Sequence, residues 1–171
     1  GTKSAELIRN LILKDYFGNS KKDKFNKYTD TLLYLAARNE HVNTKIRPAL
    51  KQKKIVICDR FTDSTIAYQV YGKKINSNFI KNIHNIIIGN LKPNITFLLK
   101  VSSKASRKRL LQRKSKNRYD NFPKSFYQKA QKSFLKIAKN KKDYFVLNSS
   151  LNNKDLEKKI FKIISNYLKI K

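Results

Sequence analysis

Several residue types are scarce in this 171-residue chain, and each scarcity excludes a class of protein. With one cysteine and two histidines, the chain cannot form an intrachain disulfide or a four-ligand Cys/His zinc site. The longest unbroken apolar run, Leu32 to Ala37, has six residues, far fewer than the roughly 20 that a membrane-spanning helix needs. No signal peptide opens the sequence, so we expect a protein of the reducing cytoplasm.

Methionine is absent throughout, including position 1. We therefore expect that the sequence is either processed or lacks the beginning of its reading frame. The residues that are present suffice for a single domain over 1–171, because 40% of them are hydrophobic and can form a core. Disorder is therefore excluded for most of the chain.

Acidic residues are also few, and the 40 lysines and arginines against 11 acids give a formal net charge of +29. Such a charge attracts any polyanion non-specifically. The lysines are spread along the whole chain, however, and no nucleic-acid-binding motif accompanies them. A solvated basic surface is the simpler interpretation, and a basic nucleic-acid or nucleotide-binding module remains the alternative.

The hydrophobic pattern predicts helices that alternate with strands. The predicted helices are Ser4–Lys14, Phe25–Lys51, Ser64–Tyr71, Asn78–Ile88, Ser103–Lys114, Pro123–Ala138 and Asn153–Leu168. Short apolar runs predict buried strands at 54–60, 94–101 and 144–147, and 115–121 is predicted to be a mobile loop. This alternation favours an α/β fold with a parallel sheet, in which ligands bind at the carboxyl ends of the strands.

Asp59 and Arg60 follow the first predicted strand directly. An acid at a strand end is typical of a carboxylate that holds magnesium in phosphoryl-transfer enzymes. The planar guanidinium of Arg60 suits two-point phosphate binding better than a lysine would. The alternative for this pair is a structural salt bridge.

Two nearby groups of side chains could recognise a base and a sugar. Thr65, Tyr68 and Gln69 lie on one short predicted helix, and Tyr34 and Arg38 form an i,i+4 pair on another. The Tyr34 ring could stack on a base while the Arg38 guanidinium bonds to its edge. The alternative is that both tyrosines are packing residues and that the polar groups are surface residues.

These motifs, in this order and at this spacing, resemble those of bacterial thymidylate kinases over essentially the whole chain. The matching segments are Gly1-Thr2, L-L-Y-L-A-A-R (32–38), I-R-P-A-L (46–50), V-I-C-D-R-F (56–61), D-S-T-I-A-Y-Q (63–69) and N-R-Y-D-N-F (117–122). The resemblance implies a P-loop NTPase-like, three-layer α/β/α fold. It also implies transfer of the γ-phosphoryl group of ATP to thymidine monophosphate (dTMP), with Mg²⁺.

By resemblance, Asp59 supports the Mg²⁺ ion, possibly through water, and the attacking phosphate, and Arg60 binds the acceptor phosphate. The segment 113–121 corresponds to the family's lid, in which Arg113 and Arg118 are the candidate catalytic cations. Cations close to the transferred group would stabilise the charge that spreads over its oxygens. The alternative for both arginines is a basic cluster at a helix end.

The resemblance also assigns the residues that bind the base and the sugar. Tyr34 stands where the family usually has a phenylalanine stacked on thymine, and Arg38 matches the arginine at the thymine edge. Thr65 and Gln69 fall among the base-facing polar positions. Tyr68 matches the tyrosine that packs near the deoxyribose and disfavours a 2′-hydroxyl.

One departure from the family is an absence. No G-x-x-x-x-G-K-[ST] sequence occurs, and Gly1-Thr2 matches the end of a segment that follows this loop in the family. We therefore expect the first strand and the ATP-binding P-loop to be missing, and the chain alone to be nearly inactive. We also expect an exposed sheet edge with uncovered apolar surface.

Two further expectations come from the family. Its members are commonly homodimers, and the apolar residues of Phe25 to Leu50 could form such an interface or could belong to the core. Another nucleoside monophosphate kinase is the nearest alternative enzyme. The A-Y-Q motif and the Tyr34/Arg38 pair favour thymine as the base.

Overall fold

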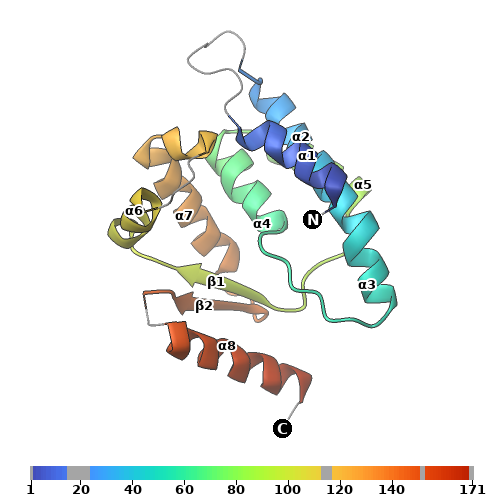
Figure 1. Ribbon diagram of the computed structural model, residues 1–171, viewed down its shortest axis with the longest axis vertical. Helices are drawn as coiled ribbons and strands as arrows, with labels where there is room; N and C mark the ends of the chain where they lie inside the picture. Colours follow the sequence, from blue (N-terminus) through green and yellow to red (C-terminus); the bar gives the residue numbers. More distant parts are fainter. Residues whose placement is uncertain (1, 15–23, 113–116, 151–152, 170–171) are drawn as a thin grey trace. The chain divides into compact units, whose positions relative to one another are not determined.

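The computed structural model describes residues 2–14, 24–112, 117–150 and 153–169 (Figure 1). These residues divide into two compact units. The first unit contains Gly1–Leu91 and Ser115–Phe134, and the second contains Lys92–Lys114 and Leu135–Lys171. Each unit is described by itself.

The first unit begins with a pair of packed helices, α1 (Lys3–Leu13) and α2 (Lys27–His41). Both have side-chain N-caps, which satisfy backbone donors that a helix leaves free at its start. The Thr2 hydroxyl accepts from the Ala5 N–H over 3.0 Å, and the Asn26 side chain accepts from the Tyr28 N–H over 2.9 Å. The predicted helix Ser4–Lys14 is thus confirmed, with its cap at Thr2.

Helix α2 continues without a break into a π-helical stretch, η1 (Val42–Ile46), and then into α3 (Arg47–Lys51). The predicted long helix over 25–51 is confirmed. Pro48 is the second residue of α3 and follows the π-helical stretch by one residue. Arg47 donates to the Ile88 carbonyl over 2.7 Å and so attaches the end of this helix to the residue that follows α5.

A second helical stretch combines α4 (Thr62–Thr65) with the π-helix η2 (Ile66–Gly72), and α5 (Ser77–Ile87) follows it. A hydrophobic core forms where α2, η2 and α5 meet. Its buried members are Leu35, Ile75 and Ile80, and Phe79 and Ile83 pack against them. This core fixes α2 beside the segment 62–72, and these two segments carry all the predicted acceptor residues except Arg60.

The prediction of a strand at 54–60 is wrong. Residues 54–58 form no strand in the structure. Ile55 is 73% exposed and Ile57 is 91% exposed. A parallel strand exists only through hydrogen bonds to a neighbour, and the one sheet among the described residues is built from two other segments. The expected uncovered apolar surface is nevertheless present at these two isoleucines.

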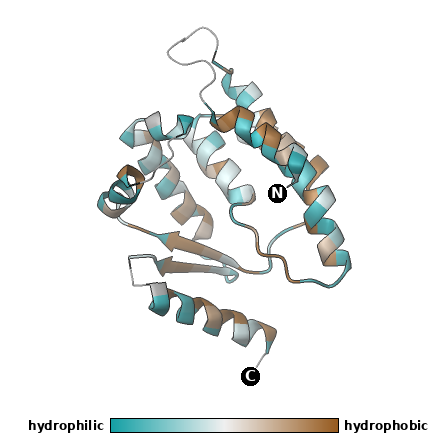
Figure 2. Ribbon diagram, in the orientation of Figure 1, coloured by the Kyte–Doolittle hydropathy of each residue, from teal (hydrophilic) through white to brown (hydrophobic). Residues whose placement is uncertain are grey.

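The second unit contains a parallel pair of strands, β1 (Thr96–Lys100) and β2 (Tyr144–Asn148), which pair from Thr96↔Tyr144 to Lys100↔Asn148. Figure 2 shows that both strands are largely hydrophobic. The helices α6 (Ser103–Leu111) and α8 (Asn153–Leu168) belong to the same unit. The predicted α/β fold with a parallel sheet is therefore confirmed.

The predicted loop 115–121 is partly wrong. Residues 113–116 lie outside the described residues, but Arg118–Asn121 forms a 3₁₀ helix, η3, ahead of α7 (Lys124–Ala138). Asn117 starts η3 with a capping box, because its side chain accepts from the Tyr119 N–H while the Asp120 carboxylate accepts from the Asn117 N–H. No helix in the described part of the chain is long and apolar enough to cross a bilayer.

Candidate functional site

Arg38 and Thr65, two residues predicted to face the base, meet in the first unit. Arg38 Nη2 on α2 donates to Thr65 Oγ1 on α4 over 3.0 Å, and the guanidinium lies 5.1 Å from the Phe61 ring centre. Burial lowers the pKa of Arg38 to about 10, so the side chain stays cationic at neutral pH. Arg38 Nε is buried and has no hydrogen-bond partner among the described residues. A buried donor of this kind favours binding of a further acceptor.

Arg60 lies against Tyr68. Arg60 Nη1 donates to the Tyr68 hydroxyl over 3.3 Å, and the guanidinium carbon is 5.6 Å from the ring centre. Arg60 has φ +64°, a left-handed backbone conformation that side chains other than glycine adopt rarely. Asp59 and Arg60 are both exposed, and within the described ranges neither side chain forms an ion pair. The salt-bridge alternative therefore has no support there.

Tyr34 and Tyr68 both contact a third ring, that of Tyr119. The Tyr34 and Tyr119 centroids are 6.0 Å apart, and those of Tyr68 and Tyr119 are 6.3 Å apart, both edge-on. Tyr68 also stacks on Phe126 at 5.9 Å. Burial raises the pKa of Tyr34 to about 12, which keeps its hydroxyl protonated and its ring neutral. The two predicted tyrosines are thus held in one aromatic cluster.

Gln69 and Thr65 are the buried polar side chains of the segment 62–72, with 3% and 2% exposure. Both therefore lie inside the first unit and are not on its surface, contrary to the surface alternative. The π-helical turn of η2 follows Thr65 directly and carries Tyr68 and Gln69. Wide turns of this kind are frequent at functional sites.

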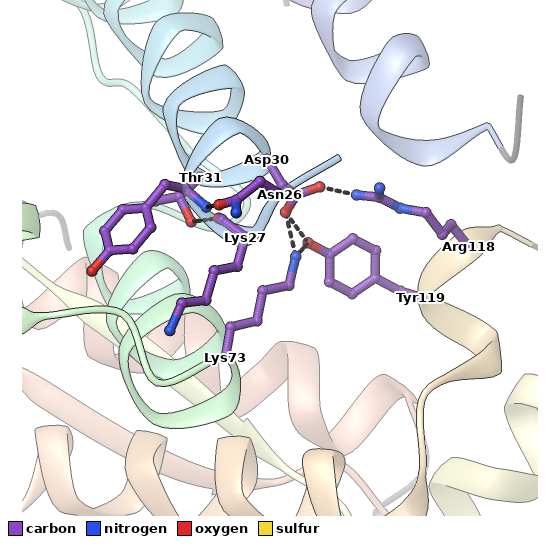
Figure 3. Close-up of polar contacts among 8 residues, drawn as sticks. Asn26, Lys27, Asp30, Thr31, Lys73, Arg118 and Tyr119 are labelled. Atoms are coloured by element: carbon purple, nitrogen blue, oxygen red, sulfur yellow. Dashed lines mark hydrogen bonds and ion pairs between the residues drawn. The ribbon is translucent and has the colours of Figure 1, made fainter. Parts of the chain in front are cut away.

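Asp30 is the site residue that sequence reasoning missed. It is 1% exposed and forms ion pairs with Lys73 and Arg118 (Figure 3). The Tyr119 hydroxyl donates to Asp30 Oδ2 over 3.2 Å and accepts from Lys73 Nζ over 3.0 Å. One signal could have found Asp30, since it lies four residues before Tyr34 on α2.

The structure brings one of the two candidate catalytic arginines to this site. Arg118 Nη2 binds Asp30, whereas Arg118 Nε is buried with no partner in the described part of the chain. Arg113 lies outside the described residues. In the described part of the first unit, the guanidinium groups of Arg38 and Arg118 each have a buried nitrogen without an acceptor. Such groups suit an anionic or carbonyl-bearing ligand.

The described residues contain no cluster of three or more His, Cys, Asp or Glu side chains that could hold a metal. Asp59, an exposed carboxylate immediately before Arg60, is a side chain that could bind a magnesium ion together with substrate phosphates.

Comparisons with known proteins agree on one family. A family model described as "Thymidylate kinase" matches residues 1–160. The chain is 42% identical over 168 residues to a thymidylate kinase of Aster yellows witches'-broom phytoplasma, covering 96% of this chain and 76% of that protein. It is 38% identical over 156 residues to one from the Wolbachia of Brugia malayi, covering 91% and 70%. A crystal structure of thymidylate kinase from Ehrlichia chaffeensis superposes with a TM-score of 0.70 at 29% identity, covering 96% of this chain and 76% of that one.

Proposed function

The chain belongs to the thymidylate kinase family, and we propose from this that it binds dTMP and transfers the γ-phosphoryl group of ATP to its 5′-phosphate, giving thymidine diphosphate. The observation that carries the proposal is the part-buried Arg38–Thr65 hydrogen bond, with an unpartnered Arg38 Nε among the described residues. The alternative of a basic nucleic-acid module is not favoured, because the family match covers residues 1–160.

In this proposal the base lies against the Tyr34 ring, and Arg38 donates to its edge. Thr65 orients the guanidinium from the other side, since its hydroxyl already takes one of the five Arg38 N–H groups. Gln69, buried on η2, supplies an amide that can both donate to and accept from a base. Stacking of a neutral aromatic ring does not depend strongly on which base is bound, because every base has a π-face.

The 5′-phosphate would be bound by Arg60. Its contact with Tyr68 supports this role, because the ring holds the guanidinium while leaving other N–H groups for phosphate oxygens. Tyr68 would then pack near the deoxyribose and disfavour a 2′-hydroxyl. Asp59 would hold Mg²⁺, directly or through water. When bound, this ion neutralises charge on the nucleotide phosphates.

Arg118 and Arg113 are proposed as the cations nearest the transferred group. For Arg118, the unpartnered Nε among the described residues supports the role, since Asp30 occupies another nitrogen of the same guanidinium. Guanidinium groups fixed in place before the reaction stabilise charge on the transferred phosphoryl at low reorganisation cost. Water exclusion around them strengthens the effect.

The ATP-binding part of the site is less complete in these 171 residues than the dTMP-binding part. They contain no G-x-x-x-x-G-K-[ST] sequence, which supplies the backbone N–H cradle and the lysine for ATP phosphates. We therefore infer slow turnover for the 171-residue chain alone. We also infer a three-layer P-loop NTPase-like sheet, a homodimer and a cytoplasmic location for the active enzyme.

The proposed function is tested by measuring the Kd for dTMP and the ATP-dependent formation of thymidine diphosphate. The Arg60→Ala substitution should weaken dTMP binding by at least about tenfold, because a charge-assisted hydrogen bond contributes about 1.5–3 kcal/mol. Arg60→Lys should recover only part of the loss, since it keeps the charge but not the planar fork. Arg107→Ala, at an exposed position of α6, removes the same charge and is the matched control. An unchanged Kd in Arg60→Ala contradicts the assignment.

A further inference from the structure

Asp30 is a buried carboxylate that joins three separate parts of the first unit. It lies on α2, and its partners Lys73 and Arg118 come from the end of η2 and from η3, which are 43 and 88 residues away in sequence. A charge with 1% exposure is retained in a protein interior only when it is paired and hydrogen-bonded. Here one negative charge faces two positive charges, so these ion-paired groups keep a net positive charge (Figure 3).

The segment that Asp30 binds, η3, also has hydrogen bonds of its own. The capping box between Asn117 and Asp120 closes η3 locally, and the Tyr127 hydroxyl donates to the Tyr119 carbonyl. What these local bonds do not determine is how η3 is attached to α2. Two polar contacts from η3, those of Arg118 and of the Tyr119 hydroxyl, end on the carboxylate of Asp30, and the side chains of Tyr119 and Tyr34 form a further hydrogen bond between η3 and α2.

This attachment sets the position of two groups in the acceptor site. The Tyr119 hydroxyl is held between Asp30 and Lys73, which places its ring edge-on to Tyr34 and Tyr68. Arg118 is held by Nη2, which leaves its buried Nε without a partner in the described part of the chain. Asp30, Tyr34 and Arg38 follow one another at four-residue steps and therefore lie along one face of α2.

We propose that Asp30 is a positioning residue of the nucleotide site, which fixes Tyr119 beside the rings of Tyr34 and Tyr68 and holds Arg118 with one nitrogen facing the ligand. The proposal rests on the proposed function, because it takes dTMP as that ligand. Asp30 itself makes no contact with the nucleotide, since both carboxylate oxygens are occupied by protein groups.

The test compares the Asp30→Asn and Asp30→Glu variants with the unmodified 171-residue chain by calorimetric titration with dTMP. Asp30→Asn should weaken dTMP binding at least tenfold, because the neutral amide no longer holds Arg118 and Lys73. Asp30→Glu keeps the charge and should restore binding to within about threefold of the original. Glu157→Gln, at an exposed position of α8, makes the same change in net charge and should leave the Kd unaltered.

A second substitution separates positioning from a general structural role. If Asp30 acts through Tyr119 and Arg118, Asp30→Asn should add less than twofold to the loss already caused by Tyr119→Ala combined with Arg118→Gln. If Asp30 has only a structural role, Asp30→Asn lowers the thermal unfolding temperature and leaves the Kd of the folded protein unchanged. That result would overturn the proposal. Fully additive losses would overturn it as well.

Tyr119→Phe covers the case in which Asp30→Asn does not fold. It keeps the ring and removes only the hydroxyl that Asp30 and Lys73 hold, so binding should weaken severalfold. An unchanged Kd in Tyr119→Phe would overturn the proposal.

Failure of the proposed function gives a different result. If the unmodified chain does not bind dTMP, the proposed function is wrong, and the positioning of Tyr119 is then measured by near-ultraviolet circular dichroism. The chain has no tryptophan, so this signal comes largely from its tyrosines. Loss of the signal in Asp30→Asn with intact helix content would support the Asp30 anchor, and an unchanged signal would overturn it.

Discussion

Arg38 and Thr65 are 27 residues apart in sequence and are joined by a 3.0 Å hydrogen bond from the guanidinium to the hydroxyl. Thr65→Val keeps the shape of the side chain but leaves a donor of Arg38 buried without an acceptor. We expect a loss of about 1–3 kcal/mol in the free energy of unfolding, the usual cost of an unpaired buried polar group. Urea denaturation at pH 7 measures this loss.

Thr31→Val is the matched control for that prediction. Thr31 is fully buried on α2, and its hydroxyl donates only to the Lys27 carbonyl one turn earlier, over 2.7 Å. Its removal leaves no buried donor unpaired, so we expect a loss below about 1 kcal/mol. Equal losses in the two variants would mean that the Arg38–Thr65 hydrogen bond contributes no more to the free energy of unfolding than the hydrogen bond from Thr31 to Lys27.

Gly72 lies so close to Phe126 that a side chain does not fit. A Cβ at this position would lie 2.5 Å from Phe126 Cε2, and Phe126 is 7% exposed and stacked on Tyr68. We expect Gly72→Ala to cost about 1–3 kcal/mol, typical of overpacking a core, and to weaken dTMP binding through the displaced Tyr68. Adding Phe126→Leu should recover part of the stability. Full stability in Gly72→Ala, measured by thermal unfolding, would show that the ring can move freely.

His84 gives the protein a predictable dependence on pH. Burial, and then the charge of Arg38, lower the pKa of His84 to about 4 in the folded protein, whereas the ordinary value is 6.5. Between these values the unfolded chain binds a proton that the folded chain does not. The stability from this group is therefore complete above pH 6.5 and is lost as the pH falls towards 4.

Chemical denaturation at pH 7 and at pH 4.5 measures this effect for His84. The His84→Gln variant should have a smaller loss of stability between the two pH values than the original chain. His41→Gln is the control, since burial also lowers the pKa of His41 but to a lesser degree. If His84→Gln loses as much stability on acidification as the original, His84 is not the group responsible.

The helices could be predicted because their signals are local. Apolar spacing gave the helix over 25–51, and apolar runs gave β1 and β2 within a few residues. The strand predicted at 54–60 failed for a physical reason, since a strand depends on a partner that spacing within the segment does not reveal. The structure has this segment unpaired, with Ile57 91% exposed.

The spacing of Asp30 and Tyr34 places both on one face of α2, but it does not reveal the charged partners of Asp30. Its charged partners lie 43 and 88 residues away, so no periodicity or motif connects them. The pairing of Arg60 with Tyr68, eight residues apart, and the i,i+4 relation of Tyr34 to Arg38 lie within the range that a motif can encode. Local pairs of this kind were therefore easier to propose than the long-range contacts of Asp30.

The most direct test of the central claim is a thermal-shift titration of the 171-residue chain with dTMP. Uridine monophosphate, adenosine monophosphate and a short DNA duplex serve as controls, because a net charge of +29 attracts any polyanion. We predict stabilisation by dTMP that exceeds the effect of every control and persists at high salt. Equal responses to all four ligands that disappear with salt would contradict a dTMP site in these residues.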